Sequence, residues 1–119
     1  MISLKYFGTL GDPSGYGQSN RADVMALFVA GVNLTTESLQ QTQFRTTYDI
    51  QEKIVQYLEG RNIPYKIKIL HITPDLYPRY MEEGKYHIGR LVWETDKLPK
   101  EWIEPANKMN EIWTTTEKH

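Results

Sequence analysis

The chain has 119 residues, of which 39% are hydrophobic and 24% are charged, and its formal net charge is -1 at pH 7. This small charge gives no electrostatic reason to expect a nucleic acid or an anionic membrane as a partner. Because the sequence contains no cysteine, it excludes disulfides, thiolate nucleophiles and cysteine-based zinc sites.

The N-terminal segment predicts a strand, a loop and a helix. Side chains of residues 2–7 alternate with a period of two, and Gly8 ends the pattern. Residues 8–17 are rich in turn formers and predict a loop, and the apolar helical arc over residues 22–30 stops at Gly31. The first residues lack the basic start and apolar centre of a signal peptide, so we interpret them as a strand.

The middle of the chain predicts a second helix between two strands. Residues 32–34 are a short strand candidate, and the polar residues 35–47 predict mostly loop. Apolar residues recur at helical spacing between Asp49, a good N-cap, and Gly60, a good C-cap. Residues 65–73 alternate with a period of two and end at Pro74, which predicts another strand.

The last third repeats the pattern. Residues 86–93 predict a strand, residues 99–109 a helix that Pro105 makes short or kinked, and residues 111–115 a final strand. Such alternation is typical of an α/β fold with a mostly parallel sheet and helices on its faces. No repeat or linker interrupts the chain, so we expect a single domain over residues 1–119. No transmembrane segment is expected, and the missing cysteines favour the cytoplasm.

The glycine-rich loop Gly11-Asp12-Pro13-Ser14-Gly15-Tyr16-Gly17 is the first candidate site. Its backbone amides and the following helix N-terminus suit a phosphate or a hydroxyl-bearing ligand. It is not a Walker loop, because Gln18 stands where lysine is needed, and it matches a dinucleotide fingerprint only in part, because Asn20 takes the third glycine position. The alternative is that the glycines only form a tight turn between strand and helix.

His71 is the second candidate, because it lies at the carboxyl end of a predicted strand. Ligands of open parallel sheets bind outside those ends, so His71 could donate to a sugar hydroxyl or act as an acid or base. The alternative is a histidine whose nitrogens are satisfied by backbone groups. His87 lies earlier in its strand and is interpreted as structural.

The third candidate is the run Trp93-Glu94-Thr95-Asp96, with Trp102 and Trp113 nearby in sequence. Aromatic faces can pack against sugar rings, and the polar groups of this run can bond to hydroxyls. Alternatively, the tryptophans are core aromatics and Asp96 caps the next helix. The two acids are too close in sequence to be assumed a glycosidase pair, and without a histidine-rich cluster we predict no bound metal.

A family resemblance depends on several motifs taken together: Ser14-Gly15-Tyr16-Gly17 before a helix, His71-Ile72-Thr73-Pro74, Tyr86-His87-Ile88-Gly89, Trp93-Glu94-Thr95-Asp96-Lys97-Leu98-Pro99, Trp102, Asn107 and Asn110-Glu111-Ile112-Trp113-Thr114-Thr115-Thr116. In this order, over nearly the whole chain, the sequence resembles the N-terminal, acceptor-side domain of GT-B-type glycosyltransferases of the large group 1 (family 4) class. Residues 93–116 are the most specific part, similar to a W-E-T-D-x-L-P-x-x-W … N-x-x-D-E-[IV]-W-x-x-[ST] pattern.

The resemblance implies a Rossmann-like sheet whose cleft faces the acceptor, opposed by a C-terminal domain that holds a nucleotide-sugar donor. It implies transfer with retention, with the nucleotide-sugar as co-substrate and no other cofactor. Carried over by position, His71 and Glu94 are the expected catalytic residues, with His71 near the donor sugar. The expected substrate-binding residues are Gly15, Tyr16, Gly17, Trp93, Thr95, Asp96 and Thr116.

The sequence departs from the family pattern at Asn110, where aspartate is common, and at Thr115-Thr116, where Pro-Ser is common. No two glutamates here have the family's spacing of seven intervening residues, a pair that belongs to the C-terminal domain. We therefore expect a domain truncated relative to a full GT-B enzyme and inactive alone. The alternatives are a non-catalytic binding or assembly module, in which the truncated sheet favours a homodimer, or a small dinucleotide-binding domain.

Overall fold

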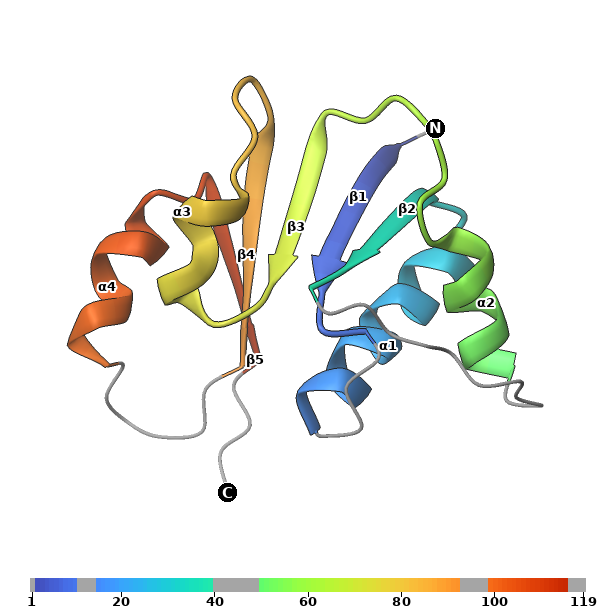
Figure 1. The fold of residues 1–119 in the computed structure, drawn as a ribbon, viewed down its shortest axis with the longest axis horizontal. Helices are drawn as coiled ribbons and strands as arrows, with labels where there is room; N and C mark the ends of the chain where they lie inside the picture. The colour runs from blue at the N-terminus through green and yellow to red at the C-terminus, as the bar shows by residue number, and fades with distance from the viewer. Residues whose placement is uncertain (1, 11–14, 40–49, 93–98, 116–119) are drawn as a thin grey trace.

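A computed structural model describes residues 2–10, 15–39, 50–92 and 99–115 (Figure 1). The sheet has five strands in the order β2-β1-β3-β4-β5, and every pair of neighbouring strands is parallel. Helices flank both faces, which confirms the predicted three-layer, Rossmann-like α/β fold. The strands are β1 (Ser3–Gly8), β2 (Asn33–Ser38), β3 (Ile67–His71), β4 (Tyr86–Val92) and β5 (Glu111–Thr115); the helices are α1 (Gly15–Val29), α2 (Ile50–Leu58), the 3-10 turn η1 (Pro74–Leu76), α3 (Tyr77–Tyr80) and α4 (Lys100–Asn107).

Two apolar clusters hold the helix layers to the sheet. On one face, buried side chains of α1 and α2 pack against alternate residues of the strands, and the members of this cluster include Leu4, Tyr6, Val24, Leu34, Val55, Leu58, Ile69 and Ile88. On the other face, Tyr77 of α3 and Met109, which follows α4, form a smaller cluster with Phe7, Leu70 and Ile72. The period of two along each strand therefore sends its side chains to two separate cores.

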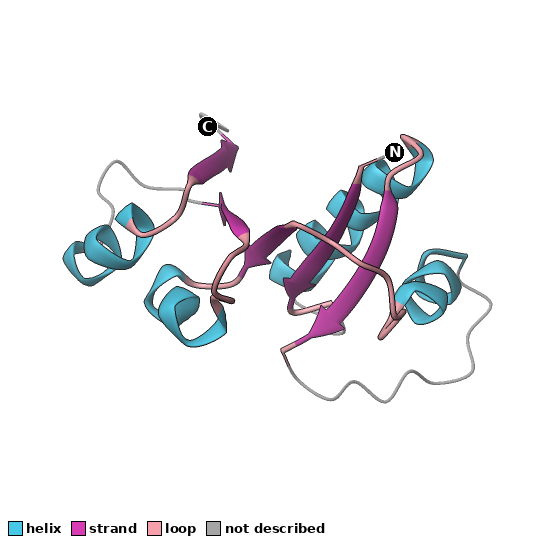
Figure 2. Ribbon diagram, turned by 90° about the horizontal axis from the view of Figure 1, so that it is seen from above, coloured by secondary structure: helices cyan, strands magenta, loops and turns pink. Residues whose placement is uncertain are grey.

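The two helix layers are displaced along the sheet. In the view from above, α3 and α4 lie on one side near β4 and β5, whereas α1 lies on the other side near β1 (Figure 2). Among the described helices, none covers the α3 side of β2 and of the first half of β1, or the α1 side of β5 and of the start of β4. These two areas, here called the open half-faces, carry polar and aromatic side chains instead of a core.

Residues that follow α2 form hydrogen bonds with the backbone groups on the outer edge of β2. Gly60 N–H donates to the carbonyl of Thr36 at 2.9 Å, and Arg61 Nη1 donates to the carbonyl of Leu34 at 2.9 Å. The carboxylate of Glu59 accepts hydrogen bonds from the backbone N–H and the hydroxyl of Ser38. The β2 edge is therefore protected against strand addition, whereas β5 forms the opposite edge of the described sheet.

Most predicted elements lie where the sequence places them. The final strand, β5, has the predicted bounds, and Gly31 and Gly60 follow α1 and α2 with φ of 86° and 67°, as expected of helix C-caps. Pro105 lies inside α4, which is short, as predicted.

Three predictions were wrong. Residues 15–17, predicted as loop, form the first turn of α1, and residues 35–38, also predicted as loop, complete β2. Pairing with β1 and the bonds from residues 59–61 hold the polar end of β2 in strand conformation, which local polarity could not indicate. The sequence prediction also gave no helix over residues 74–80, where η1 and α3 occur. Among the described residues, no helix is both long and apolar enough to cross a bilayer.

Candidate functional site

The sheet has a topological switch point between β1 and β3. β2 lies on one side of β1, whereas β3, β4 and β5 follow on the other. Gly8, the last residue of β1, pairs with His71, the last residue of β3, and α1 begins at Gly15, shortly after β1. Ligands of open parallel sheets bind outside the carboxyl ends of the strands at such a point. This edge is therefore the candidate site.

Helix α1 approaches this edge closely. A Cβ atom built on Gly8 would lie 1.7 Å from Oδ1 of Asn20, so only glycine leaves room for the helix there. Asn20 Nδ2 donates to the hydroxyl of Thr9 at 3.2 Å, and Arg21 Nη1 donates to the carbonyl of Leu10 at 2.9 Å. Side chains of the helix thus fasten it to the first residues after β1.

A polar cluster of Tyr6, Asp23, His71 and Arg90, here called the Asp23 cluster, lies between α1 and the sheet. Asp23 Oδ2 accepts hydrogen bonds from the Tyr6 hydroxyl at 2.8 Å and from Arg90 Nε at 2.9 Å. Nδ1 of His71 contacts the Tyr6 hydroxyl and lies 3.4 Å from Asp23 Oδ2. The His71 side chain is fully buried, whereas that of Asp23 is 24% exposed.

The environment fixes the protonation of this cluster. Burial lowers the pKa of His71 below its ordinary value, although Asp23 acts in the opposite direction, so the imidazole is neutral. Burial alone would raise the pKa of Asp23, but hydrogen bonds from His71, Tyr6 and Arg90 outweigh it and hold this pKa below its ordinary value. Burial, and then the charge of Asp23, raises the pKa of Tyr6 well above its ordinary value.

The tautomer of His71 follows from these bonds. The single hydroxyl proton of Tyr6 is donated to Asp23, so Nδ1 of the neutral imidazole carries its own proton and donates toward the Tyr6 oxygen. A histidine that is oriented through Nδ1 by a carboxylate is a common arrangement in sites that hydrogen-bond a substrate or move a proton. The cluster thus provides an oriented neutral imidazole beneath the carboxyl edge.

The structure brings several predicted site residues to this edge. His71 ends β3 at the carboxyl edge of the sheet. Gly15, Tyr16 and Gly17 form the first turn of α1, which begins at the same edge. β4 and β5 also end at this edge because all strands are parallel. Trp93, Glu94, Thr95, Asp96 and Thr116 lie outside the described residues, so their roles stay predictions.

Sequence reasoning did not assign Tyr6 and Asp23 to a site. Tyr6 belongs to the apolar alternation of β1 and was interpreted as part of the strand's pattern, whereas its hydroxyl reaches Asp23. Asp23 interrupts the apolar arc of α1 between Ala22 and Val24, and this interruption was the available signal.

The other aromatic and histidine candidates have different environments. Trp113 is 39% exposed, so its interpretation as a core aromatic is wrong, whereas Trp102 on α4 is partly buried. His87 is buried, and its Nε2 accepts a hydrogen bond from the backbone N–H of Glu82 at 2.9 Å, which is a structural contact. Asn110 accepts from the backbone N–H of His87 at 2.8 Å, so it ties β4 to the start of β5.

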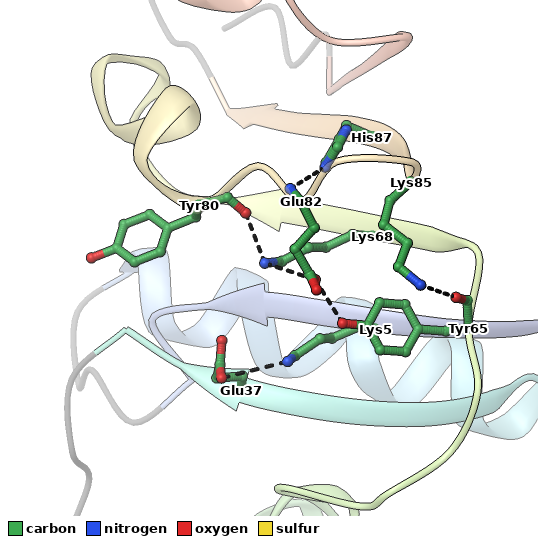
Figure 3. Close-up of polar contacts among 8 residues, drawn as sticks. All are labelled: Lys5, Glu37, Tyr65, Lys68, Tyr80, Glu82, Lys85 and His87. Atoms are coloured by element: carbon green, nitrogen blue, oxygen red, sulfur yellow. Dashed lines mark hydrogen bonds and ion pairs between the residues drawn. The ribbon is translucent and has the colours of Figure 1, made fainter.

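A second polar network lies on the α3 side of the sheet and extends from β3 across β1 to β2 (Figure 3). Lys68, whose side chain is only 5% exposed, donates to the carbonyl of Tyr80 at 2.7 Å and lies 3.2 Å from the Glu82 carboxylate. The same carboxylate accepts from the Tyr65 hydroxyl at 2.6 Å, and Lys85 Nζ lies 4.4 Å from the Tyr65 ring centroid. These contacts fasten the loops before β3 and β4 to the sheet.

A groove of about 650 Å³ borders this network, and its lining includes Lys5, Glu37, Glu59, Arg61 and Tyr65. Lys5 pairs with Glu37 at 3.5 Å, and Glu59 and Arg61 are engaged at the β2 edge. The charges that line the groove therefore have structural partners, and we assign the candidate chemistry to the carboxyl edge.

The described residues contain no candidate metal site, and comparisons with known proteins identify no relative of the chain. Within the described ranges, no three histidine, aspartate or glutamate side chains gather closely enough to hold a metal ion. No protein-family model matches the sequence, and no curated protein or solved structure is significantly similar to it. A functional conclusion therefore depends on the residues and on their geometry.

Proposed function

We propose that the chain is the acceptor-side domain of a glycosyltransferase that moves a sugar from a nucleotide-sugar donor, with retention, in the cytoplasm. One observation carries the proposal: the end of β3 at His71 and the first turn of α1 share the carboxyl edge at the switch point of an all-parallel sheet. The motif order of the sequence supports the same function. In this reaction the bond from the anomeric carbon to the diphosphate oxygen breaks with its electron pair staying on that oxygen. The acceptor oxygen bonds to the anomeric carbon, and its hydroxyl proton passes to the departing diphosphate.

His71 is proposed to lie beneath the donor-sugar side of the cleft, where its fully buried imidazole is held neutral and oriented by Tyr6 and Asp23. Gly15 and Gly17 would face the donor diphosphate or the acceptor. A preoriented polar group of this kind contributes to transfer because it does not have to reorganise during the reaction.

The described domain offers little to hold a donor by itself. A nucleotide-sugar carries a diphosphate, and the basic groups near the edge are already engaged: Arg21 bonds to the carbonyl of Leu10, and Arg90 bonds to Asp23. Closing a site from water also requires a second surface. We therefore propose that an opposing donor-binding domain completes the enzyme and that the chain alone transfers no sugar.

The test supplies a GT-B donor-binding domain, fused or in trans, with a panel of nucleotide-sugars and neutral acceptors. We expect transfer only in the presence of that domain, with the anomeric configuration retained in the NMR spectrum of the product. His71→Gln should lower kcat at least about tenfold, whereas His87→Gln, at the structural histidine, should not. No transfer across the panel, or robust transfer by the chain alone, would overturn the proposal.

The assembly alternative is favoured by one observation. Ile112 and Trp113 of the edge strand β5 are 36% and 39% exposed, whereas the β2 edge is covered by residues 59–61. A homodimer would therefore form through β5, and light scattering at micromolar concentration distinguishes it from a monomer. The dinucleotide alternative is tested by titration with NAD⁺, which a dinucleotide-binding domain would bind at the same edge.

A further inference from the structure

The open half-face on the α1 side of β4 and β5 carries an aromatic pair around one carboxylate. Register pairs Ile88 with Glu111 and Arg90 with Trp113. Ile88 belongs to the core on the α1 side, so the alternate residues Tyr86, Glu111 and Trp113 share that side. Tyr86 and Trp113 are 43% and 39% exposed. The helices of the described ranges leave this area uncovered (Figure 2).

The polar tips of both rings converge on Glu111. Trp113 Nε1 donates to Glu111 Oε1 at 2.8 Å, and the Tyr86 hydroxyl donates to Glu111 Oε2 at 2.9 Å. Tyr86 lies at the start of β4 and Trp113 lies farther along β5, so both side chains lean along the sheet toward the carboxylate between them. The two rings are therefore held in place along the surface before any ligand binds.

The charge at this surface is negative. Hydrogen bonds from Trp113 and Tyr86 hold the pKa of Glu111 below its ordinary value, so the carboxylate is ionised at neutral pH. Each of its oxygens accepts one bond from a ring and has a further lone pair. Arg90, the nearest cation by register, is already bonded to Asp23.

We propose that Tyr86, Glu111 and Trp113 form a stacking platform for a neutral hexopyranose ring of the acceptor glycan. Aromatic faces pack against the C–H face of a sugar ring, and the free lone pairs of Glu111 accept its hydroxyls. Rings that are already anchored lose little freedom on binding. The negative carboxylate repels uronic acids, phosphosugars and the nucleotide donor, so the platform selects neutral acceptors.

The position of the platform sets the size of the acceptor. Tyr86 begins β4, a strand of seven residues whose other end lies at the carboxyl edge. Seven residues of strand span roughly 20 Å, whereas Trp113 lies two residues before Thr115, the end of β5 at that edge. A glycan that contacts both rings and also reaches the edge must therefore contain several sugar rings. This inference rests on the proposed function and adds to it an oligosaccharide as the acceptor.

The test titrates the whole chain with cellotetraose and maltotetraose and follows the tryptophan indole N–H signals by NMR. We expect the Trp113 signal to shift with at least one of the two sugars, and Trp113→Ala to weaken binding about tenfold or more. Trp113→Phe, which keeps an aromatic face, should retain part of the affinity, and Glu111→Gln should reduce discrimination against glucuronic acid oligomers. Tyr57→Ala, at an exposed tyrosine on α2, is the matched control and should bind as the unchanged chain does.

Several outcomes would overturn the platform. These are no shift of the Trp113 indole with either sugar, equal losses in Trp113→Ala and Tyr57→Ala, or equal binding of neutral and acidic oligomers. Conversion of a dimer into a monomer by Trp113→Ala would show that a second copy of the chain covers this face. Because the titration needs no donor and no second domain, its failure is separate from the failure of the transfer assay.

Discussion

Arg90 Nε donates a hydrogen bond of 2.9 Å to Asp23 Oδ2 and thereby joins β4 to α1 across 67 positions of sequence. The same oxygen accepts from Tyr6 of β1. One carboxylate thus connects a helix with two strands, and the buried His71 of the strand between them contacts the same group. The stability of the candidate site should therefore depend on Asp23.

Asp23→Asn should lower the free energy of unfolding by about 2 kcal/mol, because a neutral oxygen accepts a bond from guanidinium weakly and the amide nitrogen cannot accept at all. Urea unfolding at pH 7 measures the change. Asp75→Asn, at an exposed aspartate in η1, is the matched control and should change the unfolding free energy by less than about 0.5 kcal/mol. Equal effects of the two substitutions would contradict the cluster's role.

Stability should fall as the pH decreases below about 6.5, the pKa of an unfolded histidine. The pKa of His71 is lowered in the folded chain, so below that pH the unfolded state binds a proton that the folded state does not. The loss is at most about 1.4 kcal/mol per pH unit for this histidine, and His87, whose pKa burial also lowers, adds to it.

Urea unfolding at pH 7.5, 6.5 and 5.5 tests this dependence. His71→Gln should reduce the change of the unfolding free energy with pH, because it removes the contribution of His71. The comparison requires that the far-UV circular dichroism of the variant matches that of the unchanged chain. A stability that is constant or increases between pH 6.5 and 5.5 would show that His71 is not held neutral.

Lys68→Met should destabilise the chain by about 1–3 kcal/mol, because the carbonyl of Tyr80 and the carboxylate of Glu82 lose their buried ammonium partner (Figure 3). Lys66→Met, two residues away at an exposed position, removes the same charge without those contacts and should be nearly neutral. Thermal unfolding of the two variants side by side makes the comparison. A similar loss in both would mean that overall charge, and not the network, is responsible.

Gly8→Ala should destabilise the chain by at least about 1–3 kcal/mol, because the new methyl group would overlap Asn20 Oδ1 and push α1 away from the sheet. Asn20→Ala in the same chain should restore part of the loss, and a double-mutant cycle on urea midpoints measures that coupling. Additive effects of the two substitutions would contradict the close approach of α1 to β1.

The sequence alone was sufficient for the fold class and for most elements, because both depend on short-range patterns. A period of two identified β1 and β3, and glycine at left-handed positions ended α1 and α2 at Gly31 and Gly60. It also placed His71 at the end of a strand, and hence at the carboxyl edge of a parallel sheet. These features need no knowledge of which residues meet across the fold.

Only the tertiary structure decided what surrounds those residues. The partners of His71 lie 65 and 48 positions away, at Tyr6 and Asp23, and no local pattern connects them. Residues 35–38 became strand because β1 and residues 59–61 bond to them from both sides. Trp113 became exposed because the helix layers are displaced along the sheet. Hydrogen bonding and burial depend on which distant segments the fold brings together, and that information is absent from the spacing of residues along the chain.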